Sequence, residues 1–400
     1  MGASMPGFIV SIILIGLAAG AIKSNLVPMV AEQSPRCRRT VKCMDSGKRV
    51  ILDPAITAQT IFMTVYWARN VGSLSALVTT LLRLKVDYWA AYLLPLVVLV
   101  IACVVLLLGK NTYIIVPPEG SIITKSCRAF SIGILAGGNM DAAKENFDDR
   151  FIDELKRGLV ACKIFLFFPI YWICFFQMTN NLISQAAQMY TGNVPNDLLQ
   201  NFNPIALIIL IPLFDWFVYP GLRKIGIRML PVTRITLGFF IAAVAMAYAA
   251  ITQHLIYSTG PCFANITQLC PSNNINVWIQ APSYVLIALS EIFAAITGLE
   301  YAYTKAPSSM KSLVMGMFLL TNAIGAILAI SLSPASVDPK LVWMYTGVAG
   351  FCFATGIAFW LCFRRLNSKE DHMNAIGTET KDRNVEMSRN VERNKIKDSA

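Results

Sequence analysis

Nine apolar runs, separated by polar connections, dominate the hydrophobic pattern of the chain. They lie at about 6–30, 55–82, 88–108, 159–187, 203–221, 232–257, 277–303, 313–333 and 341–362. A helix needs about 20 residues to cross the hydrocarbon core of a bilayer. Irregular backbone is not tolerated in contact with lipid, so each run is expected to span as a helix. The pattern therefore predicts an all-α membrane protein with about nine transmembrane helices.

Composition supports a membrane protein with many spans. The 400 residues are 56% hydrophobic and only 14% charged, whereas soluble domains carry about 25% charged residues. The net charge of +11 raises the alternative of a nucleic-acid-binding protein, and only the placement of the basic residues decides between the two.

The basic residues alternate between connections along the chain. Of the 34 lysines and arginines, 29 lie in the first, third, fifth and seventh connections and in the C-terminal tail, and three lie in the other four connections. By the positive-inside rule, the basic connections and the tail are predicted to be cytoplasmic. Topology and anionic lipid then explain the net charge, and a nucleic-acid partner is not expected.

The spacing of the runs suggests two unequal halves. Residues 159–363 hold six runs, a complete C-terminal bundle, and residues 1–108 hold three, a partial N-terminal bundle. A basic linker, 109–158, joins them, and the charge-mixed segment 364–400 is expected to be a disordered cytoplasmic tail. Transporters are commonly built from repeats of three and six helices. A twelve-helix protein without its first three helices is the resulting expectation.

The sixth connection is predicted to be extracellular. It holds Cys262, Cys270 and the sequon at Asn265, so a disulfide and a glycan are expected there. The alternative is a free cysteine pair and an unused sequon. The other cysteines lie mostly in apolar runs and are interpreted as small hydrophobic residues. With no CxxC motif and two histidines, no metal site or cofactor is predicted.

Ionisable residues inside the runs are the first candidates for function. Glu291 lies near the middle of the run 277–303, where a charge costs roughly 2.5–3.5 kcal/mol on insertion scales and marks a functional site. Glu300, nearer the inner end, is expected to reach water more easily. Lys23 either faces a cavity or extends to the cytoplasmic interface. Asp215 is interpreted as an inner-end ion-pair residue near Arg223.

Polar and aromatic side chains in other runs extend this set. Tyr66 and Asn70 lie one helical turn apart on a common face. Gln177 follows Trp172 in the fourth run, and Asn203 begins the fifth. These side chains line a cavity, or they make hydrogen bonds between helices, and the residues alone leave both open.

Six stretches together resemble a known family. They are GAIKSN, RVILDPAITAQTIF, VYWARNVGSLSAL, FIDELKRGLVACKIFLFFPIYWICFFQMTNNLISQA, NFNPIALIILIPLFDWFVYP and SEIFAAITGLEYAYTKAPSSMKSLVMGMFLLTNAIG. The chain is similar to the proton-dependent oligopeptide transporters of the major facilitator superfamily, and most similar to their fungal branch. The resemblance runs from about residue 16 to 363 and aligns the nine runs with family helices four to twelve.

The resemblance implies a function and a site. It implies proton-coupled import of di- and tripeptides across the plasma membrane by alternating access, with the proton as coupling ion and no enzymatic reaction. Glu291 is similar to the carboxylate that receives the peptide's amino terminus, and Lys23 to the lysine at its carboxyl end. The remaining positions that resemble cavity residues of the family are Tyr66, Asn70, Trp172, Gln177 and Asn203.

Two departures give an alternative hypothesis. The acidic-acidic-arginine motif of the family's first helix is not among these 400 residues, and Arg69 stands where an aliphatic residue is usual. Because adjacent helical positions do not share a face, Arg69 is expected to point away from the cavity that Asn70 lines. The alternative is a truncated, non-transporting member. An intramembrane enzyme is disfavoured, since the runs hold no paired aspartates, histidine cluster or GxSxG.

Overall fold

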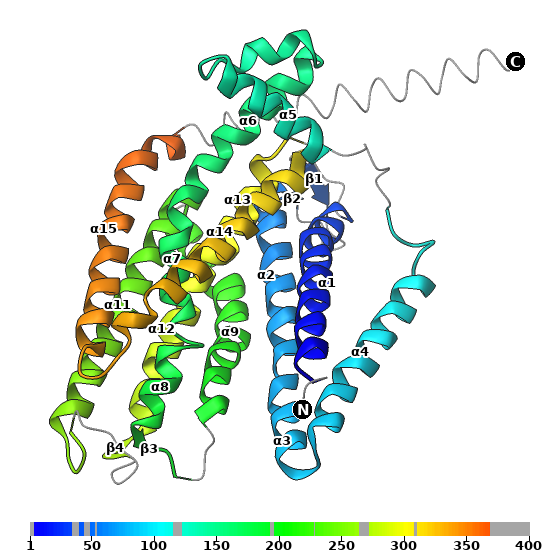
Figure 1. Ribbon diagram of the computed structural model, residues 1–400. Coiled ribbons are helices and arrows are strands. Elements are labelled where there is room, and N and C mark those ends of the chain that lie inside the picture. The colour runs from blue at the N-terminus through cyan, green and yellow to red at the C-terminus, as the bar shows by residue number, and fades with distance from the viewer. Residues whose placement is uncertain are drawn as a thin grey trace, which may run out of the picture.

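The computed structural model describes residues 4–33, 40–43, 49–52, 54–114, 122–192, 196–227, 229–263, 272–307 and 310–368. These residues are almost entirely helical (Figure 1), which confirms the predicted all-α architecture. The α-helices are α1 (Ser4–Glu32), α2 (Pro54–Ser73), α3 (Ser75–Lys85), α4 (Tyr88–Leu108), α5 (Ile122–Leu135), α6 (Asp149–Cys162), α7 (Phe168–Phe176), α8 (Asn181–Ala187), α9 (Phe202–Leu213), α10 (Tyr219–Lys224), α11 (Pro231–Ser258), α12 (Ala281–Glu291), α13 (Thr297–Lys305), α14 (Lys311–Ser331) and α15 (Leu341–Ser368).

Short elements complete the described chain. The 3₁₀ helices include Met140–Glu145, Lys163–Phe167, Asn196–Asn201 and Val277–Gln280, and Phe214–Val218 and Ile292–Ile296 are π-helical. The strands β1 (Thr40–Cys43) and β2 (Arg49–Leu52) form an antiparallel pair in which Thr40 faces Leu52. The strands β3 (Met189–Tyr190) and β4 (Asn273–Asn276) pair in parallel.

Eight helical stretches among the described residues are long and apolar enough to cross a membrane. They match eight of the nine predicted runs. The exception is the run 55–82, which is less apolar and is interrupted at Leu74, where α2 ends and α3 begins. The amide of Leu77 donates to the carbonyl of Leu74 over 3.0 Å, a three-residue spacing that tightens the helix locally. The interruption divides this run into two successive helices, and the other runs keep their predicted places along the chain.

The main hydrophobic core lies in the C-terminal six-run half. Helix α11 packs against α15 and α12, and α7 packs against α14. Phe168 of α7 is fully buried and makes edge-to-face contacts with Phe239 of α11 and Phe318 of α14. Such aromatic contacts add to the stabilisation from area burial, so α7 holds this core together.

A second core joins the two halves. Phe62 and Met63 of α2 are buried against Leu207 of α9 and Ile292 beside α12. By contrast, α4 has no buried residue, and its main packing contact is with α3 (Figure 1). Helix α2 is therefore the element of the N-terminal half that packs most closely on the C-terminal half.

One glycine sets how closely two of these elements approach. A Cβ added at Gly238 of α11 would lie 2.6 Å from the backbone nitrogen of Ala294 in the π-helical segment. Such a distance is too short for a van der Waals contact, so only glycine allows this crossing. Gly238 thereby presses the segment that follows Glu291 against α11.

The basic connections gather at one end of the molecule. In Figure 1 the β1–β2 pair, α5, α6 and the end of α13 lie at the top, and α3, β3 and β4 lie at the bottom. Residues 122–155 of the predicted linker form α5, a 3₁₀ helix and the start of α6, packed over a small core. There Asp141 accepts from Lys156 at 2.6 Å and contacts Lys144, and these bonds lower the pKa of its carboxyl group.

Candidate functional site

Glu291 is the centre of a buried polar cluster formed by three helices. It is the last residue of α12 and only 2% exposed. The hydroxyl of Tyr66 in α2 donates to Oε2, and Nδ2 of Asn203 in α9 donates to Oε1 at 2.6 Å. A buried carboxylate is costly unless its oxygens are hydrogen-bonded. The structure thus brings together three of the predicted site residues, from segments far apart in the sequence.

Irregular helix geometry surrounds this cluster. Glu291 directly precedes the π-helical segment Ile292–Ile296, and α9 is followed by the π-helical segment Phe214–Val218. The two segments touch where the rings of Phe214 and Phe293 meet edge to face at 5.3 Å. Short π-helical segments are frequent at functional sites, because the extra residue re-aims the side chains around it.

Asn70 supports the cluster indirectly. Its side chain is buried, and Nδ2 donates to the backbone carbonyl of Tyr66 one turn earlier at 2.8 Å. Trp67, between them in the sequence, donates from Nε1 to the carbonyl of Ile208 in α9 at 3.0 Å. These two bonds fix the turn of α2 that carries Tyr66 and anchor it on α9.

Two cations flank the cluster. Lys23 of α1 and Arg69 of α2 are both exposed, and each is near enough for a charge–charge interaction with the other. The guanidinium carbon of Arg69 lies 5.6 Å from the centre of the Tyr66 ring. Within the described ranges, neither cation makes a hydrogen bond or an ion pair. Glu291 and Lys23, the predicted binding residues for the two ends of a peptide, are therefore not paired with each other. We call these two residues the clamp.

Arg69 and Asn70 point to different sides of α2, because Asn70 is buried and Arg69 is exposed. That Arg69 points away from a peptide cavity stays a prediction. Tyr66 is three residues before Arg69, and positions three apart share a helical face. Arg69 consequently stacks on the tyrosine that binds Glu291, and it also interacts electrostatically with Glu291.

Trp172 and Gln177 lie in a different polar environment. Trp172 Nε1 donates to the hydroxyl of Thr321 in α14 at 3.1 Å, and Gln177 accepts from Asn181 at 2.5 Å. Neither is hydrogen-bonded to Glu291 in the described structure. Their sequence neighbours do meet: the hydroxyl of Tyr171, next to Trp172, lies 3.4 Å from that of Ser290, next to Glu291. Their assignment to a peptide cavity stays a prediction.

A buried ion pair lies outside the set of predicted site residues. Glu300, expected to reach water, is instead buried at 6% exposure, and both its oxygens accept from Arg234 at 3.0 Å. The Tyr219 ring lies 5.8 Å from the guanidinium carbon. Arg234 was counted with a cytoplasmic connection because it lies at an apolar run's edge. The sequence holds no local signal for the pair, since its members are 66 residues apart.

A chain of glutamines at the opposite end of the bundle also lies outside the set of predicted site residues. Gln280 donates to Gln185 at 2.8 Å, Gln185 to Gln253 at 2.9 Å, and Gln253 to Gln188 at 2.7 Å; Gln188 then donates to the carboxylate of Asp338. The four glutamine side chains are buried, and Asp338 is exposed. The chain ties the end of α8, α11 and the 3₁₀ helix before α12 to the connection before α15.

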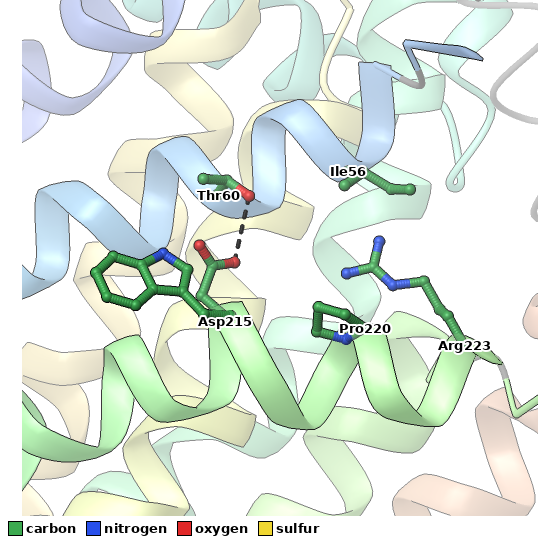
Figure 2. Close-up of a pocket in the computed structure, with 6 residues that line it drawn as sticks. Ile56, Thr60, Asp215, Pro220 and Arg223 are labelled. Atoms are coloured by element: carbon green, nitrogen blue, oxygen red, sulfur yellow. Dashed lines mark hydrogen bonds between the residues drawn. The ribbon is translucent and has the colours of Figure 1, made fainter. Parts of the chain in front are cut away.

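Asp215 lies in an open pocket beside the first turns of α2 (Figure 2). Its Oδ1 accepts from the hydroxyl of Thr60 at 3.2 Å, and Arg223 lines the same pocket. The expected ion pair of Asp215 with Arg223 is not formed in the described structure, although the two charges interact electrostatically. Asp215 joins α2 to the end of α9 through a hydrogen bond instead, because Thr60 lies directly opposite.

The remaining predicted sites are only partly described. Cys262 is disulfide-bonded, but Cys270, its predicted partner, and Asn265, the predicted glycan site, lie outside the described residues. Both assignments therefore stay predictions. Among the residues that the structure covers, no group of three histidine, cysteine or acidic side chains is placed to hold a metal ion.

Comparison with known proteins places these observations in a family context. The chain matches the family described as PTR2, the POT family, over residues 4–140 and 134–349. It is 52% identical over 388 residues to the probable peptide transporter ptr2 of Schizosaccharomyces pombe, covering 94% of this chain and 63% of that protein. It is 46% identical over 384 residues to the peptide transporter PTR2 of Saccharomyces cerevisiae, covering 94% and 64%. The chain thus spans just under two thirds of these relatives.

Solved structures show the same fold. The likeness to the POT family transporter PepTSo has a TM-score of 0.66 at 20% identity and covers 91% of this chain and 79% of that one. An auto-inhibited POT family peptide transporter gives 0.64 at 21% identity, covering 91% and 78%. The predicted transporter-type helical bundle is confirmed at the level of the fold.

Proposed function

Because this chain belongs to the POT family, we propose that it imports di- and tripeptides across the plasma membrane by proton-coupled alternating access. The observation that carries the proposal is the carboxylate of Glu291, buried in a membrane span and held by Tyr66 and Asn203 from two other helices. The names of its relatives as peptide transporters support the substrate class. The substrate undergoes no covalent change, so the proposed activity is not enzymatic.

The carboxylate of Glu291 has acceptor positions left for a peptide ammonium group. An ionised carboxylate offers about four acceptor positions, and Tyr66 and Asn203 use one on each oxygen. Both partners are neutral, so the negative charge of Glu291 is oriented without being neutralised. A peptide's amino terminus would supply the missing positive charge, and Lys23 would receive its carboxylate.

The same carboxylate can couple transport to protons. A proton and a peptide ammonium compete for Glu291, since each neutralises the same charge. Protonation of Glu291 would release the amino terminus, and deprotonation would restore its binding site. The proton is thus the coupling ion in this proposal, and the residues need no further cofactor.

Alternating access would act through the contacts of α2. Tyr66 on α2 reaches Glu291 on α12, and the buried residues Phe62 and Met63 pack beside it. A peptide bound between the two halves would bias their relative rocking, which is how such transporters move a site between faces. We place the basic connections and the tail on the cytoplasmic side by the positive-inside rule.

The test is uptake of a labelled dipeptide by cells that express Glu291→Gln. We expect uptake to fall at least roughly tenfold, because the amide carries no charge for the ammonium. The matched control is Glu145→Gln, exposed on the 3₁₀ helix 140–145, which should transport normally. Surface staining must be equal in all cells. Unchanged uptake in Glu291→Gln would remove this residue from the site, and no uptake by the parent chain would favour the non-transporting alternative.

A further inference from the structure

Arg69 holds a charge that the proposed clamp does not use. It lies about 15 residues into α2, and α3 continues for eleven more. At 1.5 Å per residue it is therefore roughly 22 Å from the start of α2. Arginine does not give up its proton in proteins, so a fixed positive charge sits near the middle of the run 55–82. Its guanidinium group turns toward Tyr66 at 5.6 Å from the ring centre.

The donors of Arg69 are unoccupied. The side chain is exposed, and among the residues with described placement it has no hydrogen-bonded or ion-paired partner. A guanidinium carries five N–H donors in a planar fork that matches a carboxylate. The contact with the Tyr66 ring uses no N–H donor in a hydrogen bond to another side chain, so the donors stay available. The fork is the part of the side chain that could bind a ligand.

The charges around the site do not balance. Lys23 and Arg69 are positive and Glu291 is negative, and Arg69 interacts electrostatically with both of the others. The three groups together carry one surplus positive charge. Lys23 and Arg69 are both exposed. A ligand with one surplus negative charge would neutralise the sum of these three charges, and a neutral ligand would not.

We propose that Arg69 is a further substrate-binding residue that makes the site selective for peptides carrying one acidic side chain. The inference rests on the proposed function, because it concerns the same site. The ammonium group of the peptide binds Glu291, its two carboxylates face Lys23 and Arg69, and the complex is neutral. A basic peptide would instead bring a second positive charge to a site that already has a surplus.

The dimensions are consistent with a short peptide. Arg69 lies over the ring of Tyr66, and the hydroxyl of the same tyrosine donates to Glu291. Both charges thus contact one side chain. Two or three extended residues span about 7–11 Å, which is enough to reach from one to the other. The bound peptide would lie along Tyr66.

The test is equilibrium binding to the purified chain in lipid nanodiscs at low salt. Three dipeptides serve as probes: Ala-Ala, Ala-Glu and Ala-Lys. We expect Ala-Glu to bind roughly tenfold more tightly than Ala-Ala, the usual size of one added charge-assisted contact. Ala-Lys should bind most weakly. Equal affinity for Ala-Ala and Ala-Glu would overturn the inference and leave the proposed function standing.

Variants locate the selectivity. Arg69→Gln should bind Ala-Glu and Ala-Ala equally, and Arg69→Lys should keep part of the difference, because it retains the charge without the fork. Arg157→Gln, exposed on α6, is the matched control and should behave like the parent chain. An acidic preference that persists in Arg69→Gln would assign it to another residue. Binding of none of the three peptides would overturn both the inference and the proposed function.

Discussion

Arg234 and Glu300 show how a pair of residues can be misjudged from the sequence. Each lies toward the end of an apolar run, where a charge normally reaches the interface. In the structure they face each other inside the bundle, with two bonds of 3.0 Å and almost no exposure. A buried pair of this kind contributes little net stability, but breaking it is costly because it leaves one charge unpaired.

We therefore expect Glu300→Gln to lower the free energy of unfolding by about 3–5 kcal/mol. The change is measured as a lower midpoint of thermal unfolding for the purified protein in detergent. The double variant Arg234→Met with Glu300→Leu should recover much of the loss, since it leaves no unpaired charge. A double variant less stable than the single one would contradict this account.

The site residues differ in how far the sequence could predict them. Glu291 was found because a carboxylate in the middle of an apolar run is costly wherever the run packs. Its contacts with Tyr66 and Asn203 could not be derived, since they join residues 225 and 88 positions apart. The contact of Arg69 with Tyr66 is of a kind that the sequence can suggest, because residues three positions apart share a helical face.

At the level of elements, the apolar pattern predicts where helices span but not their internal geometry. Runs 203–221 and 277–303 each contain a π-helical segment, yet one extra residue per turn hardly alters a pattern that is apolar on every side. The glutamine chain is similarly hidden, because its members come from four separate segments. Only the packed structure brings their amides within reach of one another.

Gly238 provides the test at this scale. We expect Gly238→Ala to destabilise the protein by about 1–3 kcal/mol, because the new methyl group meets the backbone of Ala294. Gly350→Ala in α15 is the matched control, since nothing lies within 4 Å of its added Cβ. It should be neutral or stabilising by about 0.5–1 kcal/mol from helix propensity. The midpoints of thermal unfolding of the two variants are compared. Equal midpoints would contradict the prediction, because they would show that α11 can shift away from Ala294 without loss of stability.

At the scale of the whole molecule, the order of spanning segments was predictable and their partners were not. Length and apolarity identify a membrane span without knowledge of its neighbours. Where the two halves pack on each other depends on side chains such as Phe62 of α2 and Leu207 of α9, which belong to one buried core. That core, more than any single helix, positions Tyr66 beside Glu291.

Membrane orientation is the last property of the whole molecule to be tested. The described parts of the basic connections lie at one end in Figure 1, the end that the positive-inside rule assigns to the cytoplasm. Each lysine or arginine near an anionic leaflet contributes about 1 kcal/mol, and the asymmetry of 29 against three is large on that scale. The opposite end carries the connection with Cys262, whose disulfide is typical of an extracellular compartment.

We expect an epitope placed after Ala400 to stain only permeabilised cells. An epitope inserted after Thr259, in the connection that leads to Cys262, should stain intact cells. Asn265→Gln should remove a glycan and increase the electrophoretic mobility of the protein. If the orientation were reversed, the first epitope would stain intact cells and the mobility would not change.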